Sequence, residues 1–222
     1  MPSGDRILIV GGGQGIGAAV AAVFPDRATI WTRRTGVDAT DPDALQRAFA
    51  AFRSQHGAPY ALVHTIGDFA EVPLLGTDAA TWRHLFASNV DTVFHTLQTV
   101  VPAMVEARRP GRVVLFAAAG VDRARGQRRA PAYFAAKAAV VQLARSLAAE
   151  VAEHGITVNV IAPGLIDHPH SHRDSQARML PRVPAGRLGT PADVAGAVQM
   201  LLAPDAGYLT GQVLTIDGGL QL

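Results

Sequence analysis

A tyrosine and a lysine four residues apart, Tyr133 and Lys137, are the residues best suited to proton chemistry in this sequence. On a helix, residues four apart lie on one face, so the phenol and the ammonium can flank one site. A nearby cation favours the phenolate, which predicts a pKa of Tyr133 lowered from about 10 toward working pH. The alternative is a packed tyrosine beside a lysine that extends its charged end into solvent.

Lys137 is also the single lysine among 20 basic residues, and all the others are arginine. The two side chains differ in shape, in hydration and in how far their pKa can be shifted. We therefore expect position 137 to need an ammonium, although chance survival of one lysine would give the same count.

A glycine-rich turn follows the first apolar run and opens a helical segment. It reads Gly11-Gly12-Gly13-Gln14-Gly15-Ile16-Gly17. Glycines let the backbone approach a pyrophosphate closely, and the free N–H groups at the start of a helix bind it. The turn therefore predicts a dinucleotide site. Its expected contacts are Gly11, Gly13, Gln14, Gly15, Ile16 and Gly17.

Two arginines, Arg33 and Arg34, follow the second apolar run, where an NAD site usually offers a carboxylate to the ribose 2′-hydroxyl. Guanidinium groups suit a 2′-phosphate instead, so NADP(H) is preferred over NAD(H). The alternative is a pair of solvated arginines at a strand end.

Six apolar runs alternate with helical segments along the chain, and this pattern must position those residues. The runs, read as buried parallel strands, are Arg6–Val10, Ala28–Trp31, Tyr60–Thr65, Arg112–Ala117, Thr157–Ile161 and Gln212–Ile216. The helical segments are Gly15–Phe24, Pro42–Phe52, Thr81–Ala107, Ala132–Glu153 and Pro191–Leu202. Asp41 and Thr190, each followed by proline, are typical helix starts. The alternation predicts an α/β fold: a three-layer, doubly wound parallel sheet of the Rossmann type.

Length and composition exclude several other classes. A chain of 222 residues with 49% hydrophobic and 17% charged residues predicts one folded domain over residues 1–222. No apolar run is long enough to span a membrane, and glycines interrupt any signal-peptide core, so we expect a cytoplasmic protein. The absence of cysteine excludes disulfides and thiolate chemistry. A net charge of +2 argues against nucleic acid as a partner.

Five motifs in order along nearly the whole chain resemble the short-chain dehydrogenase/reductase family. They are the turn Gly11–Gly17, Asn89 in Ser88-Asn89-Val90, Tyr133 with Lys137, Asn159–Gly164, and Leu209–Gln212 followed by Asp217-Gly218-Gly219. The resemblance implies a sheet of about seven strands, a nicotinamide cofactor, a small-molecule substrate and a homo-oligomer, either a dimer or a tetramer.

The resemblance also assigns residues to roles. It makes Tyr133 the proton donor, has Lys137 hold the nicotinamide ribose and lower the tyrosine pKa, and has Asn89 hold a water in a proton relay. Asp38 would lie at the adenine. The nicotinamide end would meet Pro163, Gly164, Ile166 and His168, at the start of a substrate lid at about residues 164–190.

The family's active-site serine has no counterpart here. Alignment from the strand puts Ala118 in its place, and counting back from Tyr133 gives Gly120. Loss of one such hydrogen-bond donor lowers a rate by on the order of 10² to 10³. Asp122 is the nearby polar residue that could replace the donor; the alternative for it is a solvated ion pair with neighbouring arginines.

Other departures lie at His64 and after Arg34. His64 stands where the family has an asparagine that fixes the sheet, and we expect it to be a buried, hydrogen-bonded histidine rather than a catalytic one. Only three residues separate Arg34 from Asp38, so the family's second helix should be missing.

Two polar segments complete the candidate site. The arginines of residues 122–130 could recruit an anionic substrate, or simply form a solvated loop. In the lid, His168 and His170 could titrate near neutrality and His170 could meet substrate. Histidines two apart share a face only on an extended segment, so we expect no metal site.

The sequence thus favours an NADP(H)-dependent oxidoreductase that transfers hydride to a carbonyl or to an activated, imine-like or pterin-like substrate, with Tyr133 as proton donor. Relatives that lack the serine, such as dihydropteridine reductases, motivate the second substrate class. The alternative is a catalytically silent NADP(H)-binding sensor or partner subunit, because a fold alone does not fix function.

Overall fold

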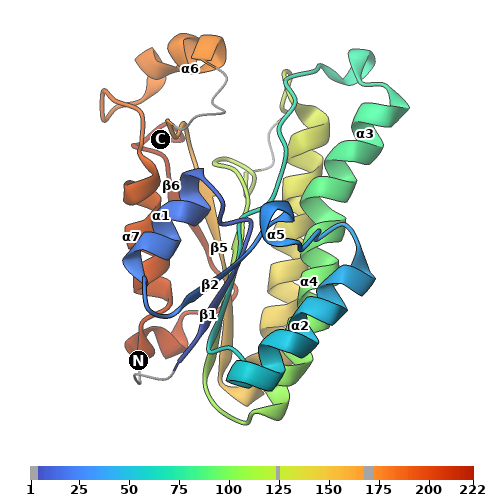
Figure 1. The fold of residues 1–222 in the computed structure, drawn as a ribbon. Coiled ribbons are helices and arrows are strands. Elements are labelled where there is room, and N and C mark those ends of the chain that lie inside the picture. The colour runs from blue at the N-terminus through green and yellow to red at the C-terminus, as the bar shows by residue number, and fades with distance from the viewer. Residues whose placement is uncertain (1–4, 124–125, 168–172) are drawn as a thin grey trace.

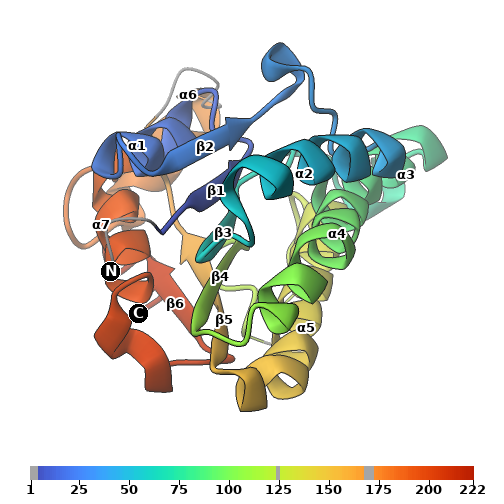
Figure 2. The same cartoon turned by 60° about the horizontal axis from the view of Figure 1, so that its bottom comes forward.

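The parallel sheet has six strands in the part of the chain that the computed structural model describes, residues 5–123, 126–167 and 173–222. The strands are β1 (Ile7–Val10), β2 (Ala28–Trp31), β3 (Ala61–His64), β4 (Gly111–Phe116), β5 (Ile156–Pro163) and β6 (Val213–Ile216). Their order is β2-β1-β3-β4-β5-β6, and every neighbouring pair is parallel (Figure 2).

Helices cover both faces of the sheet, which gives three layers (Figure 1). On one face lie α1 (Gly15–Val23) and α7 (Pro191–Leu201), and on the other lie α2 (Pro42–His56), α4 (Thr92–Glu106) and α5 (Pro131–Val151). The shorter helices α3 (Ala79–Phe86) and α6 (Arg173–Met179) lie toward one end of the molecule. The doubly wound architecture is confirmed.

Two apolar cores explain why the central strand β1 is apolar at every position. Along β1, Leu8 and Val10 belong to the core under α2, α4 and α5, whereas Ile7 and Ile9 belong to the core under α1 and α7. Because successive strand side chains point to opposite faces, a strand covered on both sides needs an apolar residue at every position.

One short connection after β2 explains both the number of strands and the absence of the family's second helix. Between β2 and α2 the chain forms only a 3₁₀ turn, Arg33–Thr35, so the family's second helix is absent, as expected. The expected count of about seven strands is too high by one among the described residues. The same shortening that removes the helix leaves no chain for an edge strand beside β2.

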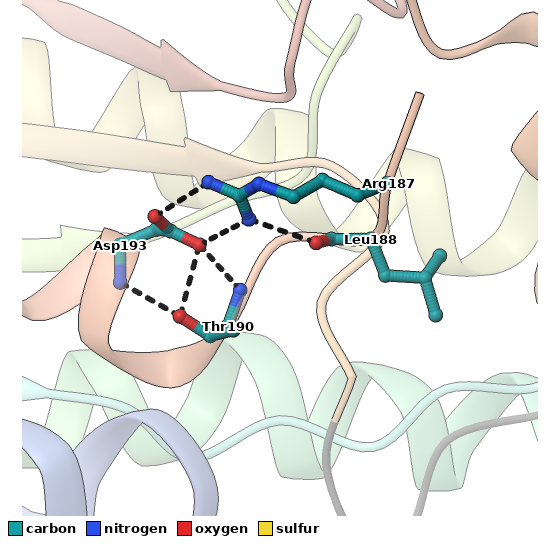
Figure 3. Close-up of polar contacts among 4 residues, drawn as sticks. All are labelled: Arg187, Leu188, Thr190 and Asp193. Carbon is teal, nitrogen blue, oxygen red and sulfur yellow. Dashed lines mark hydrogen bonds and ion pairs between the residues drawn. The ribbon is translucent and has the colours of Figure 1, made fainter. Parts of the chain in front are cut away.

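Two helix starts were correctly predicted. The Asp41 carboxylate accepts hydrogen bonds from the N–H groups of Asp43 and Ala44 at the start of α2. At the start of α7, the Thr190 hydroxyl oxygen accepts from the Asp193 N–H, and the Asp193 carboxylate accepts from the Thr190 N–H (Figure 3). Such reciprocal caps satisfy N–H groups that a helix cannot pair itself.

Backbone and side-chain contacts join the two ends of the segment expected to form a lid. Gly189 donates to the Leu165 carbonyl and accepts from the Asp167 N–H. Next to it, the Arg187 guanidinium binds both oxygens of Asp193, at 2.8 and 3.0 Å (Figure 3). This contact holds the pKa of Asp193 well below its ordinary value. The two ends of the segment are therefore joined to each other and to α7.

The expected helix over residues 81–107 is divided in three. Between α3 and α4 lies one turn of π-helix, Ala87–Asp91. A π-turn inserts one residue into the helical repeat, and such insertions often occur at functional sites. This turn carries Asn89. Among the described residues, no helix is long and apolar enough to cross a membrane.

Candidate active site

A cleft of about 1350 Å³ opens where the strands end, beside the point at which the strand order reverses between β1 and β3. In doubly wound sheets ligands bind at this place. Many of the expected site residues line it: Gly11, Gly13, Gln14, Gly15, Ile16, Gly17, Arg33, Arg34, Asp38, Ala118, Tyr133, Lys137, Pro163, Gly164 and Ile166. The structure therefore brings residues from both halves of the chain to one cleft.

The glycine-rich turn is shaped by close backbone packing. A Cβ on Gly11 would lie 2.7 Å from Thr65 Oγ1, and the φ of Gly11 is +100°, so only glycine fits without strain. A Cβ on Gly17 would lie 2.7 Å from the Gly12 Cα. Helix α1 begins at Gly15 with no side chain capping its first N–H groups. The uncapped N–H groups at this helix start, on a turn of glycines without side chains, suit the binding of the diphosphate of a dinucleotide.

The two arginines beyond β2 differ in their surroundings. Arg33 Nε donates to Asp38 Oδ2 at 2.9 Å. Asp38 also accepts from the N–H and hydroxyl of Thr40, and these contacts, more than Arg33, hold its pKa below the ordinary value. The Arg33 side chain is 76% exposed, and its contact to Asp38 leaves the terminal nitrogens open. Arg33 and Arg34 thus present guanidinium groups to the cleft, at the end where the adenosine half of a dinucleotide is expected.

Tyr133 and Lys137 lie one turn apart on α5, as expected, with the Lys137 nitrogen 5.8 Å from the centre of the Tyr133 ring. Phe69 packs edge-on against the tyrosine ring, with 4.9 Å between the ring centres. Lys137 is 4% exposed and donates to the Phe116 carbonyl at 3.0 Å. Both side chains line the cleft.

The predicted lowering of the tyrosine pKa is wrong for the protein alone. Burial raises the pKa of Tyr133 to about 12, so the phenol is neutral at working pH. Burial lowers the pKa of Lys137 to about 8, against a smaller opposing attraction from Asp68. Desolvation is therefore the dominant cause of both shifts, and the spacing of four residues does not bring about the expected lowering of the tyrosine pKa.

Asn89 and Lys137 meet at Gly67. A Cβ on Gly67 would lie 2.3 Å from Asn89 Oδ1 and 2.7 Å from Lys137 Nζ, so the two atoms are within about 5 Å of each other. Asn89 Nδ2 donates to the Asp68 and Leu85 carbonyls, each at 2.9 Å. Asn89 Oδ1 is fully buried and has no hydrogen-bond partner among the described residues. Asn89 Oδ1 is therefore a hydrogen-bond acceptor without a partner in the described chain, near the Lys137 ammonium.

No hydroxyl lies at the expected serine positions. Ala118 lines the cleft, between Ala117 and Ala119. Gly120 follows in a turn with a φ of +85°. Asp122 is exposed and is not among the described residues that line the cleft, so the structure does not support it as the replacement donor. Gln221, near the end of the chain, does line the cleft.

His64 is buried, as expected, but its hydrogen bonding was wrongly predicted. Among the described residues, neither ring nitrogen makes a hydrogen bond of normal geometry, and the Thr92 backbone provides only a weak polar contact. Burial, reinforced by the charge of Lys137, lowers the pKa of His64 to about 3. The imidazole is therefore neutral at working pH and packs under the site.

The lid segment is described in part. His168 and His170 lie outside the described residues. Beyond them, Ser175, Gln176 and Met179 of α6 line the cleft. From the loop before α5, Arg128 and Arg129 line it too, and Glu71 binds Arg129 and, in α6, Arg178 at 3.4 and 2.6 Å.

Sequence reasoning missed three residues at the site. Phe69 and Asp68 follow Gly67 in a loop whose path no local pattern fixes. Gln221 stands 88 residues after Tyr133 along the chain, and only the folded sheet brings both residues to the same cleft.

Comparisons with known proteins agree with this geometry. A family model described as enoyl-(acyl carrier protein) reductase matches residues 18–221. The 3-oxoacyl-[acyl-carrier-protein] reductase FabG of Escherichia coli (strain K12) is 31% identical, over 99% of this chain and 98% of its own. The 3-oxoacyl-[acyl-carrier-protein] reductase MabA of Mycobacterium tuberculosis (strain ATCC 25618 / H37Rv) is 32% identical, over 96% and 92%.

Solved structures give the same picture. The structure titled crystal structure of gox2181 superposes with a TM-score of 0.87 at 28% identity, over 97% of this chain and 95% of its own. A short-chain type dehydrogenase/reductase from Mycobacterium ulcerans gives 0.88 at 26%, over 97% and 89%. The chain belongs to the short-chain dehydrogenase/reductase family. It is accordingly an NAD(P)(H)-dependent oxidoreductase.

Proposed function

We propose that the protein reduces the ketone of a 3-oxoacyl thioester, with NADPH as the hydride donor and Tyr133 as the proton donor. The observation that carries this proposal is that Tyr133 and Lys137 line one cleft with the glycine-rich turn, while the buried Asn89 meets Lys137 at Gly67. The names of the relatives support the substrate class. The family model's description points instead to an enoyl group, so the two thioesters belong in one experiment.

The chain's own residues divide the work. The open start of α1 would hold the cofactor by its diphosphate, and a bound NADPH would supply the hydride that the carbonyl carbon needs. Tyr133, neutral because its pKa is raised, donates its proton to the carbonyl oxygen as charge develops there. The Lys137 ammonium stabilises the resulting phenolate and can return a proton to it, since its own pKa is about 8. Asn89 Oδ1 and Lys137 lie close enough for one bridging water, through which the lysine is reprotonated.

Arg33 and Arg34 support NADP(H) as the cofactor. Asp38 holds Arg33 by its Nε, which orients the guanidinium and leaves its forked end for a 2′-phosphate. The test compares NADPH and NADH affinities, measured by cofactor fluorescence, before and after Arg33→Ala with Arg34→Ala. We expect NADPH binding to weaken by at least tenfold while NADH binding changes little. The exposed Arg145→Ala on α5 is the matched control, and an unchanged ratio in the double variant would refute the assignment.

Turnover is tested with a panel of acceptors and NADPH, followed by loss of the reduced-cofactor absorbance. The panel holds a 3-oxoacyl thioester, a 2-enoyl thioester, and the activated imine-like and pterin-like acceptors that the missing serine suggests. We expect the 3-oxoacyl thioester to be reduced fastest and Tyr133→Phe to abolish that turnover. NADPH binding with no turnover of any acceptor would instead favour the silent sensor or partner subunit.

Three further expectations stay predictions: a substrate lid at about residues 164–190, a homo-oligomer, and a cytoplasmic location. The lid is supported by the α6 residues that line the cleft. Light scattering of the purified protein tests the oligomer, with a dimer or a tetramer as the expected result.

A further inference from the structure

The turn that follows β6 carries Gln221 into the active-site cleft. Leu220 and Gln221 line the same cleft as Tyr133 and Ala118, although they come from the far end of the chain. No mechanism described above uses them.

Asp217 builds this turn. Its carboxylate accepts from the Gly219 N–H at 3.0 Å and from the Gln221 N–H at 2.9 Å. Asp217 in turn packs on Gly164, where a Cβ would lie 2.6 Å from the Asp217 Cβ. On the other side, the Arg123 guanidinium donates to the Gln221 carbonyl. The backbone of Gln221 is therefore held from both sides, through its N–H and its carbonyl.

The Gln221 carboxamide lies against Gly120. A Cβ on Gly120 would be 2.8 Å from Gln221 Oε1 and 3.1 Å from Nε2. Gly120 is one of the two positions at which the family's serine was expected, and Ala118, the other, lines the cleft beside it. The carboxamide makes no hydrogen bond to another residue of the described chain, so its two N–H groups are available.

We propose that Gln221 donates a hydrogen bond from Nε2 to the carbonyl oxygen of the substrate, the work that the missing serine hydroxyl does in relatives. This inference rests on the proposed reduction of a ketone. The carbonyl carbon gains the hydride, the oxygen gains the proton of Tyr133, and Gln221 stabilises the negative charge that develops on that oxygen between the two events. Side-chain amides do this in other enzymes, where loss of the donor lowers kcat on the order of 10²-fold. A glutamine in place of serine also explains how the chain keeps Tyr133, Lys137 and Asn89 without the hydroxyl.

The experiment measures kcat and KM for the preferred acceptor with four variants. Gln221→Ala removes the donor, and Gln221→Glu keeps the size while replacing the donor with a carboxylate at neutral pH. Gln221→Ala with Ala118→Ser restores a hydroxyl at the family's position. Gln142→Ala, at an exposed glutamine on α5, is the control. NADPH affinity and melting temperature are measured for each, to separate catalysis from folding.

We expect Gln221→Ala to lower kcat by about 10² while NADPH affinity and melting temperature stay near those of the unaltered protein. Gln221→Glu should be as slow at pH 7 and recover as the pH falls toward 4, where a protonated carboxyl can donate. Adding Ala118→Ser to Gln221→Ala should raise kcat at least tenfold above that of Gln221→Ala alone. A structural role would produce neither the pH recovery nor the rescue.

The outcomes separate this inference from the function on which it rests. If the unaltered protein reduces the acceptor and Gln221→Ala keeps kcat within threefold, the inference is overturned and the proposed function stands. If Gln221→Ala is slow but neither low pH nor Ala118→Ser restores activity, the donor role is likewise overturned. If the unaltered protein reduces no acceptor, the proposed function fails and the inference fails with it.

Discussion

Replacing Gly67 by alanine is the sharpest test of the geometry around Lys137. The added methyl group would lie 2.3 Å from Asn89 Oδ1 and 2.7 Å from Lys137 Nζ. Real Cβ contacts essentially never fall under 3.0 Å, so the amide oxygen must retreat by about 0.7 Å and the ammonium by about 0.3 Å. The φ of Gly67 is outside the left-handed region, so the effect comes from the wedge and not from backbone strain.

The wedge should lower kcat much more than it lowers stability. A misplacement of about 1 Å in a reacting constellation can lower a rate about 10²-fold, so we expect a loss of kcat between roughly 10- and 10²-fold. Overpacking a filled site lowers the free energy of unfolding by about 1 to 3 kcal/mol. For a chain of this size that corresponds to a drop in melting temperature of roughly 2 to 12 °C.

The assay is steady-state reduction of the preferred acceptor at 25 °C, with melting temperature and NADPH affinity measured on the same preparation. Gly196→Ala is the matched control, because a Cβ there meets nothing within 4 Å and the residue lies inside α7. We expect this control to keep kcat and to raise stability slightly, since alanine favours a helix. A Gly67→Ala protein with unchanged kcat would show that Asn89 and Lys137 need not be close, and the reasoning on proton delivery would be refuted.

Three further predictions concern stability. The unaltered protein should gain about 3 kcal/mol of stability between pH 8 and 10.5, because the pKa of Lys137 is lowered from 10.5 to about 8 and the unfolded chain holds more protons in that range. Lys137→Met should abolish this rise. Urea unfolding at several pH values measures it. His64→Asn should flatten the acid side of the same profile, because a histidine pKa lowered from 6.5 to about 3 makes the unaltered protein lose up to about 5 kcal/mol as the pH falls through that range; an equally steep loss in the variant would contradict the burial of a neutral ring. Thr190→Ala removes the cap of α7 and should lower the free energy of unfolding by about 1 kcal/mol without changing kcat, and an unchanged unfolding curve would mean that the cap contributes nothing.

The layers of the fold could be predicted because each depends on local signals. Ile7–Val10, for example, is apolar at every position, as a strand covered on both faces requires. Asp41 and Thr190 mark helix starts by their own hydrogen bonds. The π-turn at Ala87–Asp91 was not predictable, since its residues continue the helical spacing on either side and only the requirement to bury Asn89 distinguishes them. The short connection after Arg34 predicted that the family's second helix is missing. The same shortness also removes the seventh strand, and that consequence was not predicted.

The site was predictable where motif and strand end coincide, and not where an electrostatic balance decides. The positions of Tyr133 and Lys137 followed from their spacing. Their pKa values did not, because spacing gives the attraction between two groups and not the hydration that each loses on burial. The same limit applies to His64, whose neighbours the sequence could not supply. Gln221 is the extreme case, since its place at Gly120 depends on the whole sheet and on the turn that Asp217 builds.

The distribution of lysine and arginine has a physical reason in the structure. Among the arginines and lysines that the structure describes, Arg112 and Lys137 are the two buried ones. Arg112 donates to three carbonyls, those of Gly111, Ala203 and Pro204, and this set suits a forked cation that stays charged. Lys137 has one carbonyl, that of Phe116, and its pKa is lowered to about 8. A guanidinium with a pKa above about 12 could hold charge at position 137 but could not release and regain a proton near neutral pH. A chain that uses arginine elsewhere therefore has an ammonium at the position where the proposed mechanism moves a proton.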